Sequence, residues 1–363
     1  MRSLSAGLCL SALVALWSGF SSLAMAEVDY PRVEPGRAIE FPRDEGSHPQ
    51  FRIEWWYLTG WVETERGDPL GFQVTFFRAR PGLDEDNPSR FAAKQLLFAH
   101  VAVSDPKRGR LMRDEKAARA GFGLAEAAEG TLDVHIDDWS MRKQGESYRV
   151  QVPSGTLRFD LYVQLTQPPL LQGEGGYSRK GRDPASASYY YSLPHLGISG
   201  SIAIENREHV VRGLAWFDHE WSSALMEEGA SGWDWVGLNL DGGGALMAFR
   251  MRDRAGGEYW AAATLREPQS DVARTYGPDE IEWEALRRWR SPRTGTEYVV
   301  EWRLKVGERT LILRPLMDDQ ENDARGSTGT LYWEGAVRAF DERDQLLGRG
   351  YLELTGYGSR VEL

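Results

Sequence analysis

Cysteine is almost missing from this chain of 363 residues: the one cysteine is Cys9. It lies in a segment typical of a secretory signal peptide, in which Arg2 supplies a positive start, residues 4–20 are mostly apolar and an Ala-x-Ala motif ends at Ala26. Cleavage after Ala26 leaves a chain that cannot form disulfides. We therefore expect residues 1–26 to be removed and the protein to be periplasmic or secreted, with no membrane span left. A retained anchor is the alternative, but the apolar run is short and interrupted by serines.

Positive charge is also scarce relative to negative charge. The chain has 43 Lys and Arg against 54 Asp and Glu, a formal net charge of −11. Removal of the signal peptide would take away one further positive charge, Arg2. An acidic surface of this kind argues against nucleic acid and anionic lipid head groups as main partners. A neutral or apolar small-molecule ligand is compatible with it.

Amphipathic helical periodicity is nearly absent as well. Only residues 114–120 suggest a short helix, whereas alternating apolar and polar residues, as at 132–136 and 157–165, predict strands with one buried side. Fourteen tryptophans and 39 glycines fit pleated surfaces joined by tight turns. The length is too great for one core and suits two domains. The sequence predicts an all-β protein with two tandem antiparallel barrels or sandwiches.

The domain boundaries follow from the distribution of these strands. We expect an extended, proline-rich lead-in at 27–50, a first β domain at 51–222 and a second at 223–363. A tryptophan-led hairpin opens each half, at 55–78 and at 233–252, which suggests an internal duplication. A long loop rich in Gly and Pro, residues 167–185, is suited to cover a barrel mouth.

The central segment 211–221 concentrates the titratable groups. If it stays extended, His219 shares one side with the small residues Gly213 and Ala215, and Asp218 and Glu220 point to the other side. Small residues inside a barrel leave space for a ligand. A bulge would reverse the assignment. Two interpretations stay open: a functional cluster beside the tryptophans, or carboxylates in structural ion pairs with a buried, hydrogen-bonded histidine.

Several catalytic motifs are missing. Three consecutive strand residues cannot all face one ion, and no second histidine has ligand spacing, so no metal site is expected. There is no Gly-x-Ser-x-Gly motif for a serine nucleophile. The glycine clusters at 173–176 and 242–244 precede no helix and predict turns rather than phosphate loops. We therefore expect no cofactor.

Five motifs, in order along the chain, carry a resemblance to a known family. They are Ile53–Gly60 (IEWWYLTG), Tyr189–Ser192 (YYYS), Gly213–Trp221 (GLAWFDHEW), Gly232–Trp235 (GWDW) and Tyr332–Ala336 (YWEGA). The chain resembles the exported, AttH-like group often labelled "predicted secreted hydrolase", which is related to the carotenoid 1,2-hydratases. The resemblance covers essentially the mature chain. It implies two tandem lipocalin-like (calycin) barrels and apolar, lipid- or isoprenoid-like ligands.

Water addition by the hydratase relatives implies an acid that protonates an alkene and an aromatic pocket that shelters the carbocation. The catalytic candidates are Asp218, His219 and Glu220. The ligand-binding candidates are Glu54, Trp56, Tyr57, Tyr191, Trp216, Trp221, Trp233, Asp234 and Trp235.

Three functional hypotheses remain open at this point. The first is an exported protein that binds an apolar ligand near the domain junction. The second is a hydratase-type lyase or a secreted hydrolase that uses Asp218 or Glu220 as proton donor. The third is a non-catalytic partner of an envelope transport system, for example of the ABC type, in which the tryptophans only join the two barrels.

Overall fold

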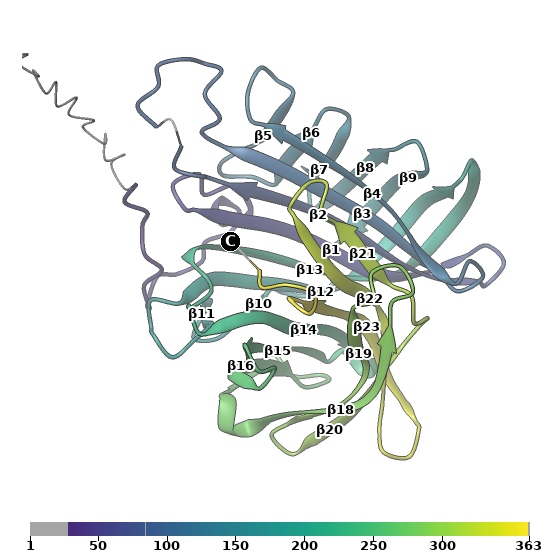
Figure 1. Cartoon of the computed structure of the whole chain (residues 1–363). Coiled ribbons are helices and arrows are strands. Elements are labelled where there is room, and N and C mark those ends of the chain that lie inside the picture. Colours follow the sequence, from purple (N-terminus) through teal and green to yellow (C-terminus); the bar gives the residue numbers. More distant parts are fainter. Residues whose placement is uncertain (1–27, 84, 362–363) are drawn as a thin grey trace, which may run out of the picture.

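The computed structural model describes residues 28–361 except residue 84 (Figure 1). The expected signal peptide, residues 1–26, lies outside this range. The described chain folds into two antiparallel sheets with three short 3₁₀ helices, η1 (Arg43–Glu45), η2 (Asp241–Gly243) and η3 (Pro278–Glu280). No helix in the described range is long and apolar enough to span a membrane.

The first sheet has thirteen strands and the second has ten. The first contains β1 (Ile53–Thr64), β2 (Pro69–Ala79), β3 (Leu96–Asp105), β4 (Arg110–Arg119), β5 (Ala125–Ala127), β6 (Asp133–Ile136), β7 (Trp139–Gln144), β8 (Ser147–Pro153), β9 (Leu157–Gln164), β10 (Leu170–Leu171), β11 (Tyr177–Arg179), β12 (Ala187–Ile204) and β13 (Arg207–Ala224). The second contains β14 (Ala230–Leu240), β15 (Ala245–Asp253), β16 (Glu258–Arg266), β17 (Ala273–Tyr276), β18 (Ile281–Arg290), β19 (Glu297–Val306), β20 (Arg309–Pro315), β21 (Glu321–Ala324), β22 (Thr330–Phe340) and β23 (Leu346–Thr355).

The two sheets have the same strand order. The first runs β4-β3-β2-β1-β13-β12-β9-β8-β7-β6-β5 and the second runs β17-β16-β15-β14-β23-β22-β20-β19-β18. Thus β1 corresponds to β14, β13 to β23 and β12 to β22. The two tryptophan-led hairpins, β1–β2 and β14–β15, hold the same place in their sheets, as expected for an internal duplication.

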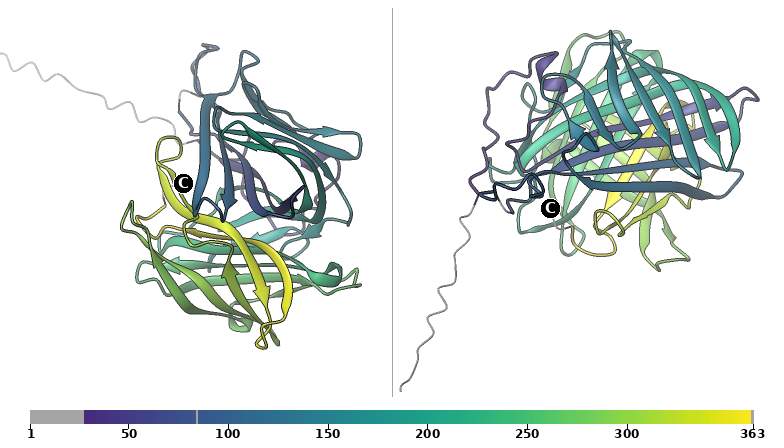
Figure 2. Two further views of the ribbon diagram at one scale, coloured as in Figure 1. Left: turned by 90° about the vertical axis from the view of Figure 1, so that its right-hand side faces the viewer. Right: turned by 90° about the horizontal axis from the view of Figure 1, so that it is seen from above.

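Each sheet curls around its own apolar core, and the two curled sheets lie against each other (Figure 2). A third apolar cluster fills the junction between them and includes Tyr57, Trp216, Trp235 and Tyr351. The prediction of an all-β fold with two antiparallel barrels is confirmed. The predicted short helix at 114–120 is wrong: residues 110–119 form β4, whose backbone groups pair along the whole of β3. This pairing outweighs the helix propensity of the charged sequence.

Strand parity separates the cores from the junction. On β1, Trp56 and Leu58 face the first core, whereas Tyr57 and Trp61 belong to the junction cluster. On β13, the residues 211, 215, 217 and 221 face the first core, whereas Trp216 belongs to the junction. The segment 211–221 stays extended within β13, so its alternation is as expected. The expectation that the ligand space lies on the side of His219, Gly213 and Ala215 is wrong, because Asp218 and Glu220 face the junction between the barrels.

The proline-rich lead-in covers one end of the first barrel. The 3₁₀ turn η1 is held there because the Trp56 indole N–H donates to the Glu45 carbonyl (3.2 Å) and the Lys143 ammonium pairs with the Glu45 carboxylate (2.5 Å). The backbone N–H of Ser47 donates to the carbonyl of Ala128 (2.7 Å). The lead-in therefore closes this barrel end, and its own His48 side chain is buried there.

Candidate functional site

A cavity of about 360 Å³ lies at the junction of the two barrels. One wall consists of residues from β1, β2, β12 and β13, and the other of residues from β14, β15, β22 and β23. Its apolar lining includes Trp55, Phe77, Phe98, Trp233, Trp235 and Phe249. Its polar lining includes Tyr57, Lys180, Tyr190, Asp218, Glu220, Tyr332, Glu334 and Glu353. The site therefore combines an aromatic enclosure with several buried carboxyl groups.

Asp218 supplies the first of these carboxyl groups. It is buried, and its Oδ1 accepts hydrogen bonds from Ser192 Oγ (2.5 Å) and Trp216 Nε1 (2.8 Å). Burial raises the pKa of Asp218 to about 7, because the apolar surroundings disfavour the charged form more than these donors favour it. Tyr190 also acts to lower the pKa of Asp218 by hydrogen bonding, but burial has the larger effect. Near neutral pH, Asp218 can thus give or take a proton.

Glu353 supplies a second carboxyl group from the opposite wall. Its Oε1 accepts hydrogen bonds from Trp233 Nε1 (3.0 Å) and Thr355 Oγ1 (2.7 Å). Glu353 is half-buried, and the partial loss of water around its carboxyl group raises its pKa to about 7. Its direct cross-strand neighbour is Glu334, whose pKa is raised well above the usual range by burial and by the charge of Glu353. At neutral pH this pair therefore holds at least one proton.

The two acids with a pKa of about 7 occupy equivalent places in the two barrels. Asp218 of β13 lies opposite Tyr57 of β1, and Glu353 of β23 lies opposite Trp235 of β14. Since β1 corresponds to β14 and β13 to β23, the duplicated topology places one titratable acid on each wall of the cavity.

Lys180 supplies one positive charge of the cavity lining, and Arg78, which pairs with Glu54, supplies another. Lys180 follows β11 in the long loop predicted to cover a barrel mouth, and its Nζ lies 2.6 Å from Glu220 Oε1. Both side chains are buried, and the ammonium lies over the rings of Tyr190 and Phe249 (4.6 and 4.4 Å to the centroids).

The Tyr57 hydroxyl and the Glu334 carboxyl group both line the cavity. Within the described chain, neither the hydroxyl nor Glu334 Oε1 has a partner at normal hydrogen-bond distance, but the two groups lie close enough that the Tyr57 hydroxyl acts to lower the pKa of Glu334 and Glu334 raises the pKa of Tyr57. Tyr332 differs, since its hydroxyl lies 2.8 Å from His100 Nδ1 and accepts a hydrogen bond from Asn322.

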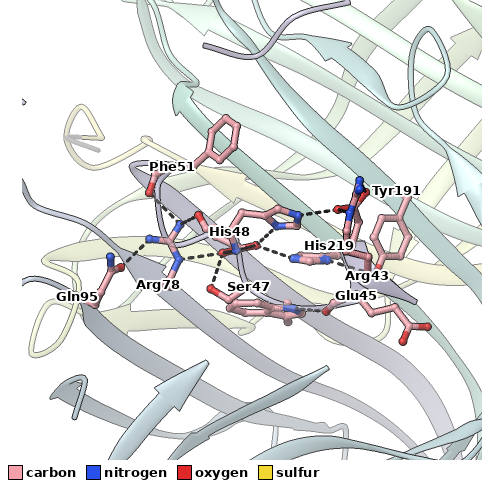
Figure 3. A network of polar contacts seen from close by, with 12 residues as sticks. Arg43, Glu45, Ser47, His48, Phe51, Arg78, Gln95, Tyr191 and His219 are labelled. Atoms are coloured by element: carbon pink, nitrogen blue, oxygen red, sulfur yellow. Dashed lines mark hydrogen bonds and ion pairs between the residues drawn. The ribbon is translucent and has the colours of Figure 1, made fainter. Parts of the chain in front are cut away.

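His219 lies on the opposite face of β13 from the cavity acids, inside the first barrel (Figure 3). Its Nε2 is 3.0 Å from Glu54 Oε1 and its Nδ1 is 3.2 Å from the Tyr191 hydroxyl. Glu54 is also bound by His48 Nδ1 (2.7 Å) and Arg78 Nε (2.8 Å). Burial acts to raise the pKa of Glu54, but Arg78 and the two histidines hold it well below the usual range.

His48, Glu54 and His219 form a group of possible metal ligands among the described residues, with their ligand atoms within 4.8 Å of one another. Two histidines and a glutamate are a donor set that zinc can use, but here the two imidazoles contact the carboxylate directly and Arg78 neutralises it. The imidazoles also stack on Trp221 and Trp56, which fixes the planes of their rings. We interpret the group as a hydrogen-bond network that fixes the lead-in to the barrel.

Comparison with known proteins shows which family has this architecture. A family model described as AttH-like matches residues 32–357. The chain belongs to the AttH-like family. A crystal structure of an AttH candidate from Nitrosomonas europaea is 48% identical, with a TM-score of 0.84 and coverage of 90% of this chain and 99% of that one. The predicted AttH-like identity is thereby confirmed.

Two solved structures with lower identity share the fold. Kievitone hydratase from Nectria haematococca has 15% identity and a TM-score of 0.67, with coverage of 91% of this chain and 96% of that one. CghA in complex with Sch210972 has 15% identity and a TM-score of 0.53, with coverage of 85% and 90%. No curated protein sequence matches the chain. These likenesses support the lipocalin-like description of both barrels.

The structure divides the sequence-predicted site residues of this AttH-like protein into two groups. Those that line the cavity are Glu54, Tyr57, Asp218, Glu220, Trp233 and Trp235. Those placed outside its lining are Trp56, Tyr191, Trp216, His219, Trp221 and Asp234. Trp216 lies directly behind the lining and donates to Asp218. Asp234 pairs instead with Arg250 (2.7 Å) and Arg252 (3.2 Å).

Sequence reasoning missed Lys180, Tyr190, Tyr332, Glu334 and Glu353 as lining residues. Three of them, Tyr190, Tyr332 and Glu334, belong to motifs that carried the family resemblance. An alignment of the two halves extended to the last strand would have placed Glu353 opposite Trp235, as Asp218 lies opposite Tyr57.

Proposed function

We propose that this protein is an exported acid–base enzyme that adds water to, or removes it from, an apolar unsaturated small molecule held in the junction cavity. The observation that carries the proposal is the presence of one acid with a pKa of about 7 on each wall of an aromatic enclosure, Asp218 and Glu353. General acids and bases work best when their pKa lies near the working pH.

A binding protein alone would have little use for these acids. Burying a carboxyl group among aromatic rings costs free energy. Carboxyl groups with a perturbed pKa in such places are therefore typical of sites that use their chemistry. Glu334 Oε1 and the Tyr57 hydroxyl add further polar atoms in the same lining. Simple enclosure of an apolar ligand would favour aliphatic residues at all four places.

In the proposed reaction one wall of the cavity supplies the proton donor and the other supplies the proton acceptor. Protonated Asp218 transfers its proton to one carbon of the double bond, and the developing carbocation lies among Trp55, Trp233 and Trp235. A water molecule bonds to the other carbon and gives up a proton to ionised Glu353. Alkene and water are thereby converted to an alcohol, and proton exchange with solvent returns both acids to their starting states. The reverse sequence is dehydration.

The fold shared with kievitone hydratase supports the choice of hydration among acid–base reactions. At 15% identity it supports the scaffold and not the substrate. Hydrolysis, the other reaction expected from the family resemblance, would need an activated nucleophile or water beside a polar bond, and the apolar lining favours a hydrocarbon substrate.

The test uses purified protein in heavy-oxygen water with a linear isoprenoid, squalene, and an unsaturated fatty acid, linoleic acid. We expect labelled alcohol from at least one of them. Asp218→Asn should lower the rate by about 10²–10⁴-fold, and Glu353→Gln should do the same, because each removes one proton transfer.

The matched control is Asp234→Asn, which removes a buried carboxylate that pairs with arginines away from the cavity lining. Labelling that persists in both Asp218→Asn and Glu353→Gln would contradict the assigned roles. Retention of substrate binding without any labelling in the wild-type protein would favour the binding-protein hypothesis.

A further inference from the structure

A second cavity, of about 270 Å³, adjoins the first. The two share three lining residues, Ile53, Leu225 and Val361, so the second is the outer continuation of the first. Its other lining includes two arginines, Arg52 at the start of the first barrel and Arg360 near the end of the chain. The last described residues, 356–361, follow β23 and run to the junction of the two barrels (Figure 1).

The last described residues form one edge of this outer cavity. The backbone N–H of Val361 donates to the carbonyl of Ser231 (3.2 Å), and the Val361 side chain is buried. Val361 thus separates the aromatic interior from Arg360, which is exposed. At this edge the apolar side chain of Val361 is buried and the guanidinium of Arg360 is exposed to solvent.

The two cavities differ in the charged groups that line them: arginines line the outer cavity, and carboxyl groups are the main ionisable groups of the inner cavity. Within residues 28–361, excluding residue 84, neither Arg52 nor Arg360 makes an ion pair. The inner cavity instead carries the carboxyl groups of Asp218, Glu220, Glu334 and Glu353. An anionic group is therefore attracted to the mouth and disfavoured in the interior, where burial already raises the pKa of Asp218, Glu334 and Glu353.

Lys180 does not change this balance. Its ammonium already lies 2.6 Å from Glu220, and both are buried. A ligand anion brought next to Lys180 would have to displace Glu220 or lie beside it, and either arrangement leaves an uncompensated buried charge.

We propose that the ligand is amphipathic: a carboxylate lies at the mouth between Arg52 and Arg360, and an unsaturated apolar chain extends past Val361 into the aromatic interior. Guanidinium groups suit this role because they bind carboxylates through paired N–H donors. The proposal rests on the proposed function and names its substrate class, an unsaturated long-chain or isoprenoid acid. It also defines the orientation of the bound ligand, with the carboxylate at the mouth and the reacting double bond in the interior.

The test compares two fluorescent probes that differ only in charge, cis-parinaric acid and its methyl ester. Binding is followed by energy transfer from the cavity tryptophans. The acid should bind at least about tenfold more tightly than the ester at low salt, and added salt should reduce this preference because the mouth is exposed. Arg52→Gln combined with Arg360→Gln should remove the preference and leave ester binding unchanged.

Two control variants make the outcome decisive. Arg110→Gln removes an exposed arginine of β4 that does not line either cavity and should change neither affinity. Lys180→Met tests the opposite orientation, with the carboxylate inside. Equal affinities for acid and ester, or a preference that Lys180→Met removes and the arginine pair does not, would overturn the head-group assignment while leaving the junction cavity as the binding site. Failure of both probes to bind would overturn the proposed function as well.

Discussion

Replacing Asp218 with asparagine should stabilise the folded protein at alkaline pH even though it abolishes the proposed proton transfer. In the unfolded chain Asp218 loses its proton as the pH rises through its ordinary value of 3.8, whereas in the folded protein it keeps the proton up to about pH 7. Between these two values folding takes up a proton, so the free energy of unfolding falls as the pH rises. Above pH 7 the loss is complete and constant.

The size of this loss follows from the two pKa values. The interval from 3.8 to about 7 corresponds to about 4 kcal/mol, at about 1.4 kcal/mol for each pH unit. Asparagine carries no charge at any pH, and its amide oxygen can still accept the hydrogen bonds from Ser192 and Trp216. We therefore expect the variant to match the wild type near about pH 4 and to exceed it by a few kcal/mol near about pH 8.

Urea unfolding followed by tryptophan fluorescence at these two pH values measures the difference directly. Asp279→Asn, at an exposed position of η3, is the matched control and should show no such dependence on pH. A stability difference between wild type and Asp218→Asn that is the same at both pH values would refute the argument, because it would mean that Asp218 is ionised to the same extent in both states.

Three further changes test other parts of the structure. Lys180→Met should lower the free energy of unfolding by about 3–5 kcal/mol, because it leaves Glu220 buried without its partner, and adding Glu220→Gln should restore most of the loss. Glu54→Gln should destabilise the first barrel by about 3–5 kcal/mol and make the lead-in sensitive to limited proteolysis, because Arg78 and both histidines lose their shared carboxylate. Gly71→Val should loosen the contact between barrels, because even a Cβ at Gly71 would lie 2.6 Å from Ala336 Cβ, and calorimetry should then resolve two unfolding transitions in place of one.

Sequence reasoning reached the fold because alternation is a local property. The period of two along β13 assigned Asp218 and Glu220 to one side and His219 to the other, and the structure keeps that alternation. The sequence could not predict what each side of β13 packs against. A strand face that packs into its own barrel core has the same local pattern as one that packs against a second barrel. This is why His219 was grouped with the acids, although it lies in the first core.

The remaining site residues were hidden for related reasons. Glu353 lies in a strand whose pattern is that of any half-buried strand, and its burial depends on the opposite wall. Lys180 lies in a loop, where no periodicity reports which way a side chain points. His48 lies far from His219 in sequence and meets it only through Glu54, so ligand-type spacing along the chain could not reveal the pair.

The equivalence of β13 and β23 has an evolutionary consequence. If the barrels arose by duplication, the ancestral single barrel presented one acid on an outer face that was open to water, where a carboxyl group keeps its ordinary acidity. Only fusion of two copies brought those faces together and excluded solvent from both. The chemistry would then be a product of the pairing itself, and a gene fragment encoding either barrel alone would preserve the scaffold while losing the reaction chamber.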